Sequence, residues 1–370
     1  MVNGCVTSDE DMEALVYLEF ADRLRRSGIG TAASHQRRAL ESAEEVEVVA
    51  NPWVGESPSS GVGQLLRGRS ALKQFDLAHC NLFGPGSLAV ARAAKRRDVP
   101  LIVHAHVTAE DFQNSFRGSS TIAPVLRRYL RWFYSRADLV LCPSEHTKRR
   151  LETYPVTPAV EPVSNGVDRD ALDGFEQLRD QYRDRFDLDG TVVFTVGNVF
   201  ERKGLSAFCE LARDLDSADT ESGDFQFAWF GPYDTGPLAS KTVRRWVTQP
   251  PDNVVFTGWV EDIRGAFGAG DIYLFPTHEE NQGIAALEAM ACGKPVVLRD
   301  LDVFREYYTD GEDCLLCETR ADFERALRRL SEDPGLAARL GQNARETAAE
   351  HSLEEVQKRL SSIYREQLRV

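Results

Sequence analysis

Two glutamates, Glu280 and Glu288, stand on either side of Gly283 in the segment HEENQGIAALEAMACGKPVV, which covers residues 278–297. The alanine-rich run after Gly283 predicts a short helix, which the later GKP sequence should end. A helix start offers free backbone N–H groups, and these groups can hold an anion such as phosphate. Gly283 would let the backbone come close to that ligand, because glycine carries no bulky side chain. The spacing therefore predicts an anion site between two carboxylates.

The two carboxylates are expected to differ in role. Glu280 would lie in the loop beside the anion, and Glu288 one turn into the helix, pointing back toward the same ligand. A carboxylate repels phosphate but accepts two hydrogen bonds from a vicinal diol. The favoured ligand therefore carries phosphates flanked by hydroxyl groups, which is the layout of a nucleotide-sugar. Two solvated surface glutamates would give the same spacing in so acidic a chain, so the spacing alone leaves that interpretation open.

These residues need a scaffold, and the apolar pattern of the chain predicts one. Short β-branched runs alternate with longer amphipathic stretches, which is typical of parallel sheets covered by helices. The runs lie at residues 14–20, 46–50, 75–80, 100–106 and 137–143 in the first half, and at 191–197, 224–231, 253–258, 271–276, 295–298 and 313–317 in the second. The loop of Glu280 follows the run at 271–276, at the carboxyl end of a strand.

We expect an α/β protein with two doubly wound parallel-sheet domains, each Rossmann-like, that face a cleft. A proline-rich segment at residues 153–170 separates the halves, so the domains should cover residues 1–165 and 166–350. The last stretch, residues 351–370, predicts a helix that could pack back on the first domain. Ligands of such sheets bind at the carboxyl ends of the strands, so the chemistry should lie in the cleft.

The bulk composition narrows the class of protein. The net charge of −14 disfavours a general nucleic-acid binder, which needs a basic face. The apolar runs are too short for a membrane span, and the first residues do not have the pattern of a signal peptide, so we expect a cytoplasmic protein. The chain has 7 Lys against 37 Arg. Many carboxylates with little lysine predict a salt-rich, halophilic cytoplasm, although a high-GC genome would also favour arginine.

Several blocks together resemble a known family. ENQGIAALEAMACGKPVV, with NVVFTGWV before it and FREYYTDGEDCLL after it, resembles the donor-binding core of the retaining glycosyltransferases of family 4, which have the GT-B fold. SNGVD at 164–168 and GNVFERKG at 197–204 match other blocks of that family in the same order. The stretch HAHVTAEDF, and ENQGI in place of the commoner EGFG, are similar to diacylglycerol and other glycolipid glucosyltransferases. The resemblance covers most of the chain.

The resemblance implies roles for residues of the second half. Glu288 would bind the ribose of the donor, and Glu280 would lie beside the transferred sugar. Lys203 would pair with the diphosphate, where negative charge grows as the group leaves. The other implied donor residues are Asn198, Arg202, Gly283, Ile284 and Ala285. This chain has Asn198 where the family usually has arginine, so Arg202 would supply that positive charge, and the last three would act through backbone amides.

In the first half, the resemblance makes His106 a sugar-contacting histidine at the end of the strand PLIVHAH. Glu110 and Asp111 align with an acidic pair on the acceptor side of lipid glucosyltransferases. Gly28 and Gly30, in RRSGIGT, match a glycine-rich loop that lets the backbone approach the donor. A histidine that caps a strand and an ordinary tight turn are the simpler interpretations, and both stay open.

The segment 123–151 departs from the acidic average. Arg127, Arg128 and Arg131 alternate with apolar and aromatic residues, and three more basic residues follow at 148–150. Basic and aromatic residues together suit a membrane interface, where the aromatic residues 132–134 would insert. A core-facing helix with a solvated basic side would give the same pattern.

The sequence therefore predicts a hexosyltransferase. It would move a hexosyl group from a nucleotide-diphosphate sugar, with a UDP-sugar favoured, to a hydroxyl group of a membrane lipid, with retention at the anomeric carbon. No metal or other cofactor is expected, because amides and basic side chains would hold the phosphates. Such an enzyme would lie at the inner face of the cell membrane. The alternatives are a transferase for a soluble sugar or a lipid-linked oligosaccharide, and a non-catalytic GT-B subunit that only binds nucleotide-sugar.

Overall fold

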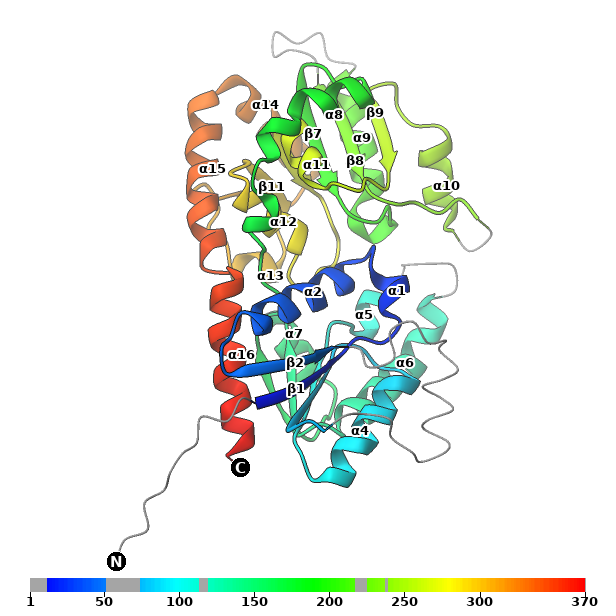
Figure 1. Cartoon of the computed structure of the whole chain (residues 1–370). Helices are drawn as coiled ribbons and strands as arrows, with labels where there is room; N and C mark the ends of the chain where they lie inside the picture. Colours follow the sequence, from blue (N-terminus) through cyan, green and yellow to red (C-terminus); the bar gives the residue numbers. More distant parts are fainter. Residues whose placement is uncertain (1–11, 51–73, 113–118, 217–224, 237–238, 370) are drawn as a thin grey trace, which may run out of the picture.

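The computed structural model describes residues 12–50, 74–112, 119–216, 225–236 and 239–369. The chain forms two six-stranded sheets whose paired strands run parallel, with helices on both sides of each sheet (Figure 1). Sheets of this kind are buried on both faces, which explains the nearly continuous apolar runs of the strands. The predicted pair of doubly wound parallel sheets is confirmed.

The first sheet has the strand order β2-β1-β3-β4-β5-β6. Its strands are β1 (Met12–Tyr17), β2 (Val46–Ala50), β3 (Leu77–Cys80), β4 (Leu101–His104), β5 (Leu139–Cys142) and β6 (Ala159–Pro162). Its helices are α1 (Ala21–Leu24), α2 (Gly28–Glu41), α4 (Pro85–Arg97), α5 (Ala109–Phe112), α6 (Ser119–Tyr134) and α7 (Glu145–Glu152).

The second sheet has the order β12-β11-β10-β7-β8-β9. Its strands are β7 (Thr191–Val196), β8 (Phe225–Phe230), β9 (Val254–Gly258), β10 (Ile272–Phe275), β11 (Val296–Arg299) and β12 (Leu315–Cys317). Its helices include α8 (Arg179–Phe186), α9 (Leu205–Asp216), α10 (Lys241–Thr248), α11 (Arg264–Ala269), α12 (Ile284–Ala291), α13 (Asp302–Arg305), α14 (Arg320–Glu332) and α15 (Pro334–Ala349). The short 3₁₀ helices are η1 (Asp170–Leu172), η2 (Phe175–Leu178) and η3 (Glu201–Lys203).

Each of the eleven predicted runs contains a strand, but two details differ from the prediction. Strand β1 ends at Tyr17 instead of residue 20, because Phe20 takes the left-handed φ of 56° and leads into α1. Strand β6 was missed inside the proline-rich segment. It lies at the edge of its sheet and ends at Pro162, a position where the missing N–H of proline costs little.

The last helix, α16 (Leu353–Leu368), returns to the first sheet and packs beside α2 (Figure 1). Just before this helix, the His351 carbonyl accepts a backbone hydrogen bond of 2.8 Å from the Val167 N–H. Its apolar residues Val356, Leu360 and Ile363 join one buried cluster with side chains of β1 and β2. Helix α16 thus belongs to the core of the first sheet, although it follows the second in the chain.

Candidate active site

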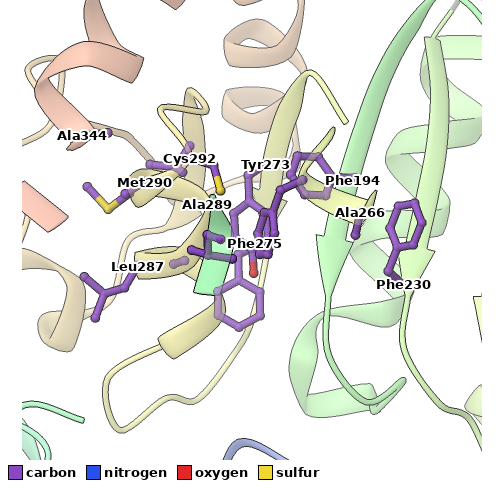
Figure 2. Close-up of a cluster of buried hydrophobic side chains, with 14 of the residues drawn as sticks. Phe194, Phe230, Ala266, Tyr273, Phe275, Leu287, Ala289, Met290, Cys292 and Ala344 are labelled. Atoms are coloured by element: carbon purple, nitrogen blue, oxygen red, sulfur yellow. The ribbon is translucent and has the colours of Figure 1, made fainter. Parts of the chain in front are cut away.

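The loop of residues 276–283 lies at the carboxyl end of β10 and leads into α12. Gly283 has a φ of +90°, and a Cβ built there would lie 3.0 Å from the ring of Phe304. The backbone angle therefore requires glycine at this helix start, and the tight space further disfavours a side chain there. Leu287 and Met290 hold the helix in place, because they are buried in the aromatic core of the second sheet (Figure 2).

Helix α12 borders a cavity of about 240 Å³ that lies between the two sheets. Five of the predicted donor residues line this cavity: Gly28, Asn198, Ile284, Ala285 and Glu288. A second cavity, of about 510 Å³, shares Glu288 and Arg25 with the first and is also lined by Gly30. The structure therefore brings residues from both halves of the chain to one cleft, with Glu288 where the two cavities meet.

The glycine-rich loop is the start of α2. Ser27 caps this helix, and its hydroxyl oxygen accepts a bond of 3.3 Å from the Gly30 N–H. A Cβ on Gly30 would lie 2.1 Å from the Leu24 carbonyl oxygen, so this position needs glycine for close packing. Gly28 is exposed and faces the smaller cavity.

Glu288 is a half-buried carboxyl in this cleft. Burial raises its pKa to about 7, and the nearby Asp168 carboxylate adds to this increase. A carboxyl with a pKa near neutral, beside a cavity, is a common feature of a ligand site. It can take either protonation state at physiological pH.

A cluster of charges lies next to the start of α12. Lys203 forms an ion pair with Glu280, and Arg202 lies 3.7 Å from the same carboxylate. The two segments are also joined through the backbone, because the His278 N–H donates to the Arg202 carbonyl at 2.7 Å. The residues predicted to hold the diphosphate and the sugar therefore lie together, although about 75 positions separate them in the chain.

His106 follows β4 and is the last member of a stack of three buried histidines. The ring centroids of His79 and His104 are 5.8 Å apart, and those of His104 and His106 are 4.2 Å apart. Gln36 donates to His104 at 2.7 Å, and the Nε2–H of His106 donates to the Asn81 Oδ1 at 3.0 Å. Burial lowers the pKa of His106 to about 3. The His106 ring is therefore neutral and can bind a hydroxyl, but it does not supply positive charge.

The sequence analysis did not identify three polar residues near the cleft: Asn81 and Asn281 bond to His106, and Gln282 bonds to Ser164 and Asn165. Asn81 directly follows β3 and lines the larger cavity. Asn281 and Gln282 reach the first half of the chain, as described below. The signal for Asn281 and Gln282 was ENQGI in place of the commoner EGFG, and the signal for Asn81 was only a polar residue after a predicted strand.

The predicted acceptor residues Glu110, Arg127, Arg128 and Arg131 do not line either of the two cavities. The Glu110 carboxylate accepts a bond of 2.5 Å from the Tyr154 hydroxyl. The side chain of Asp111 lies outside the described residues. Arg127 donates to the Thr153 carbonyl at 3.1 Å, and Arg131 donates to the Pro155 carbonyl at 3.1 Å, whereas Arg128 is exposed.

Two parts of the predicted membrane segment are wrong. Phe133 and Tyr134 are buried in the core of the first sheet, so they cannot insert into a membrane, whereas Trp132 is 43% exposed. Two residues of the basic run at 148–150 face the second domain instead of a membrane: Arg149 pairs with Glu306 and Arg150 with Glu279, whereas Lys148 pairs with Glu145 in the same helix. Among the described side chains of α6, the exposed ones are Pro124, Val125, Arg127, Arg128, Arg131 and Trp132, so Trp132 is the only exposed aromatic residue among them.

The described residues contain no group of three or more His, Cys, Asp or Glu side chains that could hold a metal ion. Within the same part of the chain, none of the helices combines the length and the apolar character needed to cross a membrane.

Two family models match the chain. The model described as Glycosyltransferase Family 4 matches residues 14–171, and the one described as Glycosyl transferases group 1 matches residues 190–333. The processive diacylglycerol alpha-glucosyltransferase of Acholeplasma laidlawii is 31% identical over 366 residues, which are 97% of this chain and 99% of that protein. The alpha-galactosylglucosyldiacylglycerol synthase of Streptococcus pneumoniae is 24% identical over 70% of this chain and 69% of its own length.

Solved structures share the fold. A sucrose-phosphate synthase from Thermosynechococcus elongatus superposes with a TM-score of 0.75 and 17% identity, over 96% of this chain and 98% of that chain. Anabaena HepE in complex with UDP-glucose gives 0.73 and 16%, over 95% and 99%. Two facing parallel sheets with a shared cleft are the arrangement of the GT-B fold. The chain belongs to glycosyltransferase family 4, and it is a hexosyltransferase.

Proposed function

We propose that this hexosyltransferase takes its sugar from a nucleotide-diphosphate sugar, with a UDP-sugar favoured, and transfers it to a hydroxyl group of a membrane lipid. One observation supports this donor: the start of α12 and the Glu288 carboxyl line one cavity, and Lys203 and Arg202 lie next to that helix start through their contacts with Glu280. Amides and cations suit the phosphates, and the carboxyl suits the flanking diol. The shared fold with HepE, which was solved with UDP-glucose, is compatible with this donor.

The lipid acceptor is supported by the relatives. The protein that is 31% identical over nearly the whole chain is named for transfer to diacylglycerol, and the second is named for a glycosylated diacylglycerol. An enzyme with such an acceptor has to meet the membrane surface. The exposed face of α6, with Trp132 and Arg128, offers aromatic and basic groups for a peripheral position there.

Retention is proposed to follow a front-face route. Glu280 is held by two cations and is thereby poorly placed to act as a nucleophile on the sugar. The departing phosphate would instead take the proton of the acceptor hydroxyl as the new bond forms. Lys203, Arg202 and the amides at residues 283–285 would stabilise the charge that grows on the leaving diphosphate. The neutral His106 would bind a hydroxyl of the sugar.

The test is a product analysis. The purified protein is incubated with a panel of nucleotide-sugars and with diacylglycerol in mixed micelles, and products are identified by mass spectrometry and by the anomeric signal in NMR. We expect a glycosylated lipid with the anomeric configuration of the donor. Reactions without lipid and with soluble sugars serve as controls. A product made only with soluble sugars or with a lipid-linked oligosaccharide would replace the proposed acceptor.

Metal removal gives a second test of the same proposal. Activity should persist in excess EDTA, because helix-start amides and basic side chains would supply the counter-charge for the diphosphate. The measurement is the initial rate before and after dialysis against EDTA. A loss that Mn²⁺ or Mg²⁺ restores would contradict the proposed role of Lys203 and Arg202 as the main counter-charge.

A further inference from the structure

The four residues 279–282, which we term the bridging loop, each bind a different part of the molecule. Glu279 pairs with Arg150, Glu280 with Lys203, Asn281 with His106 and Thr147, and Gln282 with Ser164 and Asn165. Three of these four residues reach the first half of the chain or the segment that joins the halves, and Glu280 stays within the second half. The bridging loop therefore fixes the position of the donor side of the cleft relative to the opposite wall.

Asn281 makes the contact closest to the proposed chemistry. Its Nδ2 donates to the backbone carbonyl of His106 at 3.2 Å. Its Oδ1 lies 3.2 Å from the Thr147 hydroxyl, which donates to it. Thr147 is buried and its hydroxyl accepts a bond of 2.9 Å from Ser144. This chain of bonds sets which end of the Asn281 amide faces His106.

Asn281 also follows Glu280 directly, and consecutive Cα atoms lie only about 3.8 Å apart. One peptide unit therefore separates the residue that holds Lys203 from the residue that holds His106. The His106 ring is itself oriented by Asn81 and by the stack on His104. Because the ring is fixed on its own backbone, fixing that backbone also fixes the ring relative to Lys203.

We propose that Asn281 is a positioning residue for glycosyl transfer, which holds His106 at a set place relative to Glu280 and Lys203 across the cleft. Thr147 keeps the Asn281 amide in the orientation that this requires. The inference rests on the proposed function, since it assumes that His106 and Lys203 act on the two ends of one donor. A misplacement of reacting groups by about 1 Å can cost about 100-fold in rate, so Asn281 should affect turnover.

The kinetic test compares Asn281→Ala with Asn343→Ala. Asn343 also donates its side-chain amide to a backbone carbonyl, that of Glu312 at 2.8 Å, but within the second half and away from the cleft. We expect Asn281→Ala to lower kcat by about 10- to 100-fold while the donor KM and the affinity for UDP change by less than about threefold. Asn343→Ala should leave kcat unchanged. An unaltered kcat in Asn281→Ala would overturn the proposal, and so would a loss that merely follows a lower melting temperature.

The role of Thr147 is tested by a pair of variants. Thr147→Ser keeps the hydroxyl donor and should retain kcat, whereas Thr147→Val removes it and should lower kcat by less than Asn281→Ala does. Because Thr147 acts through Asn281, the double variant Asn281→Ala with Thr147→Val should match Asn281→Ala alone. Additive losses would show that Thr147 acts independently, which would overturn this part of the proposal.

Hydrogen exchange tests the contact without any substrate. We expect backbone amides of residues 104–109 to exchange faster in Asn281→Ala, by roughly tenfold, and to be unchanged in Asn343→Ala, because local opening becomes easier when a bond is lost. Unchanged exchange in both variants would overturn the proposal. If the wild type transferred sugar from none of the nucleotide-sugars but the exchange difference were present, the proposed donor would be wrong and the positioning contact would still be supported.

Discussion

Two groups of side chains near the cleft are of opposite kinds. Lys203, Arg202 and Glu280 lie in contact beside the start of α12, and we term them the charged wall. His79, His104 and His106 form a stack in the first sheet that burial keeps neutral, and we term it the neutral wall. His79 and His104 are fully buried, and His106 bonds to Asn81, which lines the larger cavity. The charged wall lies where the proposed diphosphate would leave, and of the neutral wall only His106 is proposed to bind a sugar hydroxyl. The contrast suggests that the two walls tolerate different changes.

Acid should destabilise the fold through the neutral wall, and this loss of unfolding free energy is the largest effect that we expect. The folded pKa values of His79 and His106 are about 3, and burial also lowers that of His104. Between pH 6.5 and 3 the unfolded chain therefore binds protons that the folded chain does not, so stability is complete above about pH 6.5 and falls as the pH decreases. Each such histidine contributes up to about 1.4 kcal/mol per pH unit.

The measurement is the free energy of unfolding by denaturant between pH 5 and pH 8. His79→Gln keeps a polar partner for the Tyr364 hydroxyl but does not titrate, so its stability should fall less steeply with acid. Variants of His146 or His278 are poor controls, since partial burial also lowers the pKa values of these residues. The wild type under the same conditions is the reference. An equal slope in the wild type and in His79→Gln would contradict the assignment.

Removal of Lys203 should lower the turnover that depends on the charged wall. Lys203→Ala takes away a preorganised counter-charge for the leaving group, so we expect the barrier to rise by roughly 2–4 kcal/mol with a smaller effect on donor affinity. Lys241→Ala, at an exposed lysine in α10, is the matched control. The measurement is kcat and donor KM for both variants. Unchanged turnover in Lys203→Ala would remove this residue from the mechanism.

Glu288 sharpens the comparison, because it is a carboxyl on the charged side whose pKa is raised to about 7. The ionised form accepts two hydrogen bonds from a ribose diol, so donor affinity should rise as the pH increases through 7 and fall below it. Glu288→Gln should lower affinity by roughly tenfold and flatten this pH profile, with little change in kcat, because ribose contacts persist during transfer.

Titration calorimetry with UDP at pH 6, 7 and 8 checks this prediction. Glu261→Gln is the control, since Glu261 borders the same cavity with a side chain that is 83% exposed. Its affinity profile should follow that of the wild type. A loss of kcat without a loss of affinity in Glu288→Gln would speak for a role in the chemical step instead.

The smallest effect concerns the outer surface of the first domain, where α6 carries exposed positive charge that the neutral wall of the same domain lacks. Arg128→Ser should weaken binding to anionic liposomes by about 1 kcal/mol at low salt. It should have little effect at 1 M salt, where the Debye length is about 3 Å. Trp132→Ser should weaken binding at both salt concentrations, because apolar insertion is not screened.

Liposome sedimentation decides between these outcomes, with Arg339→Ser on α15 as an exposed control and circular dichroism to confirm folding. Arg127 and Arg131 are less useful targets, because they donate to the Thr153 and Pro155 carbonyls and their loss would disturb the chain there. If neither Arg128 nor Trp132 matters, lipid is reached through another surface.

The sequence predicted best what neighbouring residues decide. The apolar runs located eleven strands, and Gly283 located the start of α12, because both depend on local pattern and backbone freedom. The charged wall could also be predicted, since its residues come from two compact motifs that match the family. The individual backbone hydrogen bonds around these motifs could not be predicted.

The neutral wall could not be predicted in the same way. It joins His79, His104 and Tyr364, and the bond between His79 and Tyr364 spans 285 positions. Nothing in the local pattern around a histidine encodes such a partner. For the same reason a basic run at 148–150 suggested a membrane contact, although two of its arginines pair with distant glutamates of the second domain.

The return of α16 to the first sheet has a consequence for synthesis. The side chains of Val356, Leu360 and Tyr364 complete an apolar cluster whose other members include Met12 and Val16. Ribosomes add about 5–20 residues per second, so the first sheet waits roughly 10–40 s after its own last strand before this covering helix emerges. During that interval the newly made first half exposes an apolar face, and a chaperone or the ribosome surface would have to shield it.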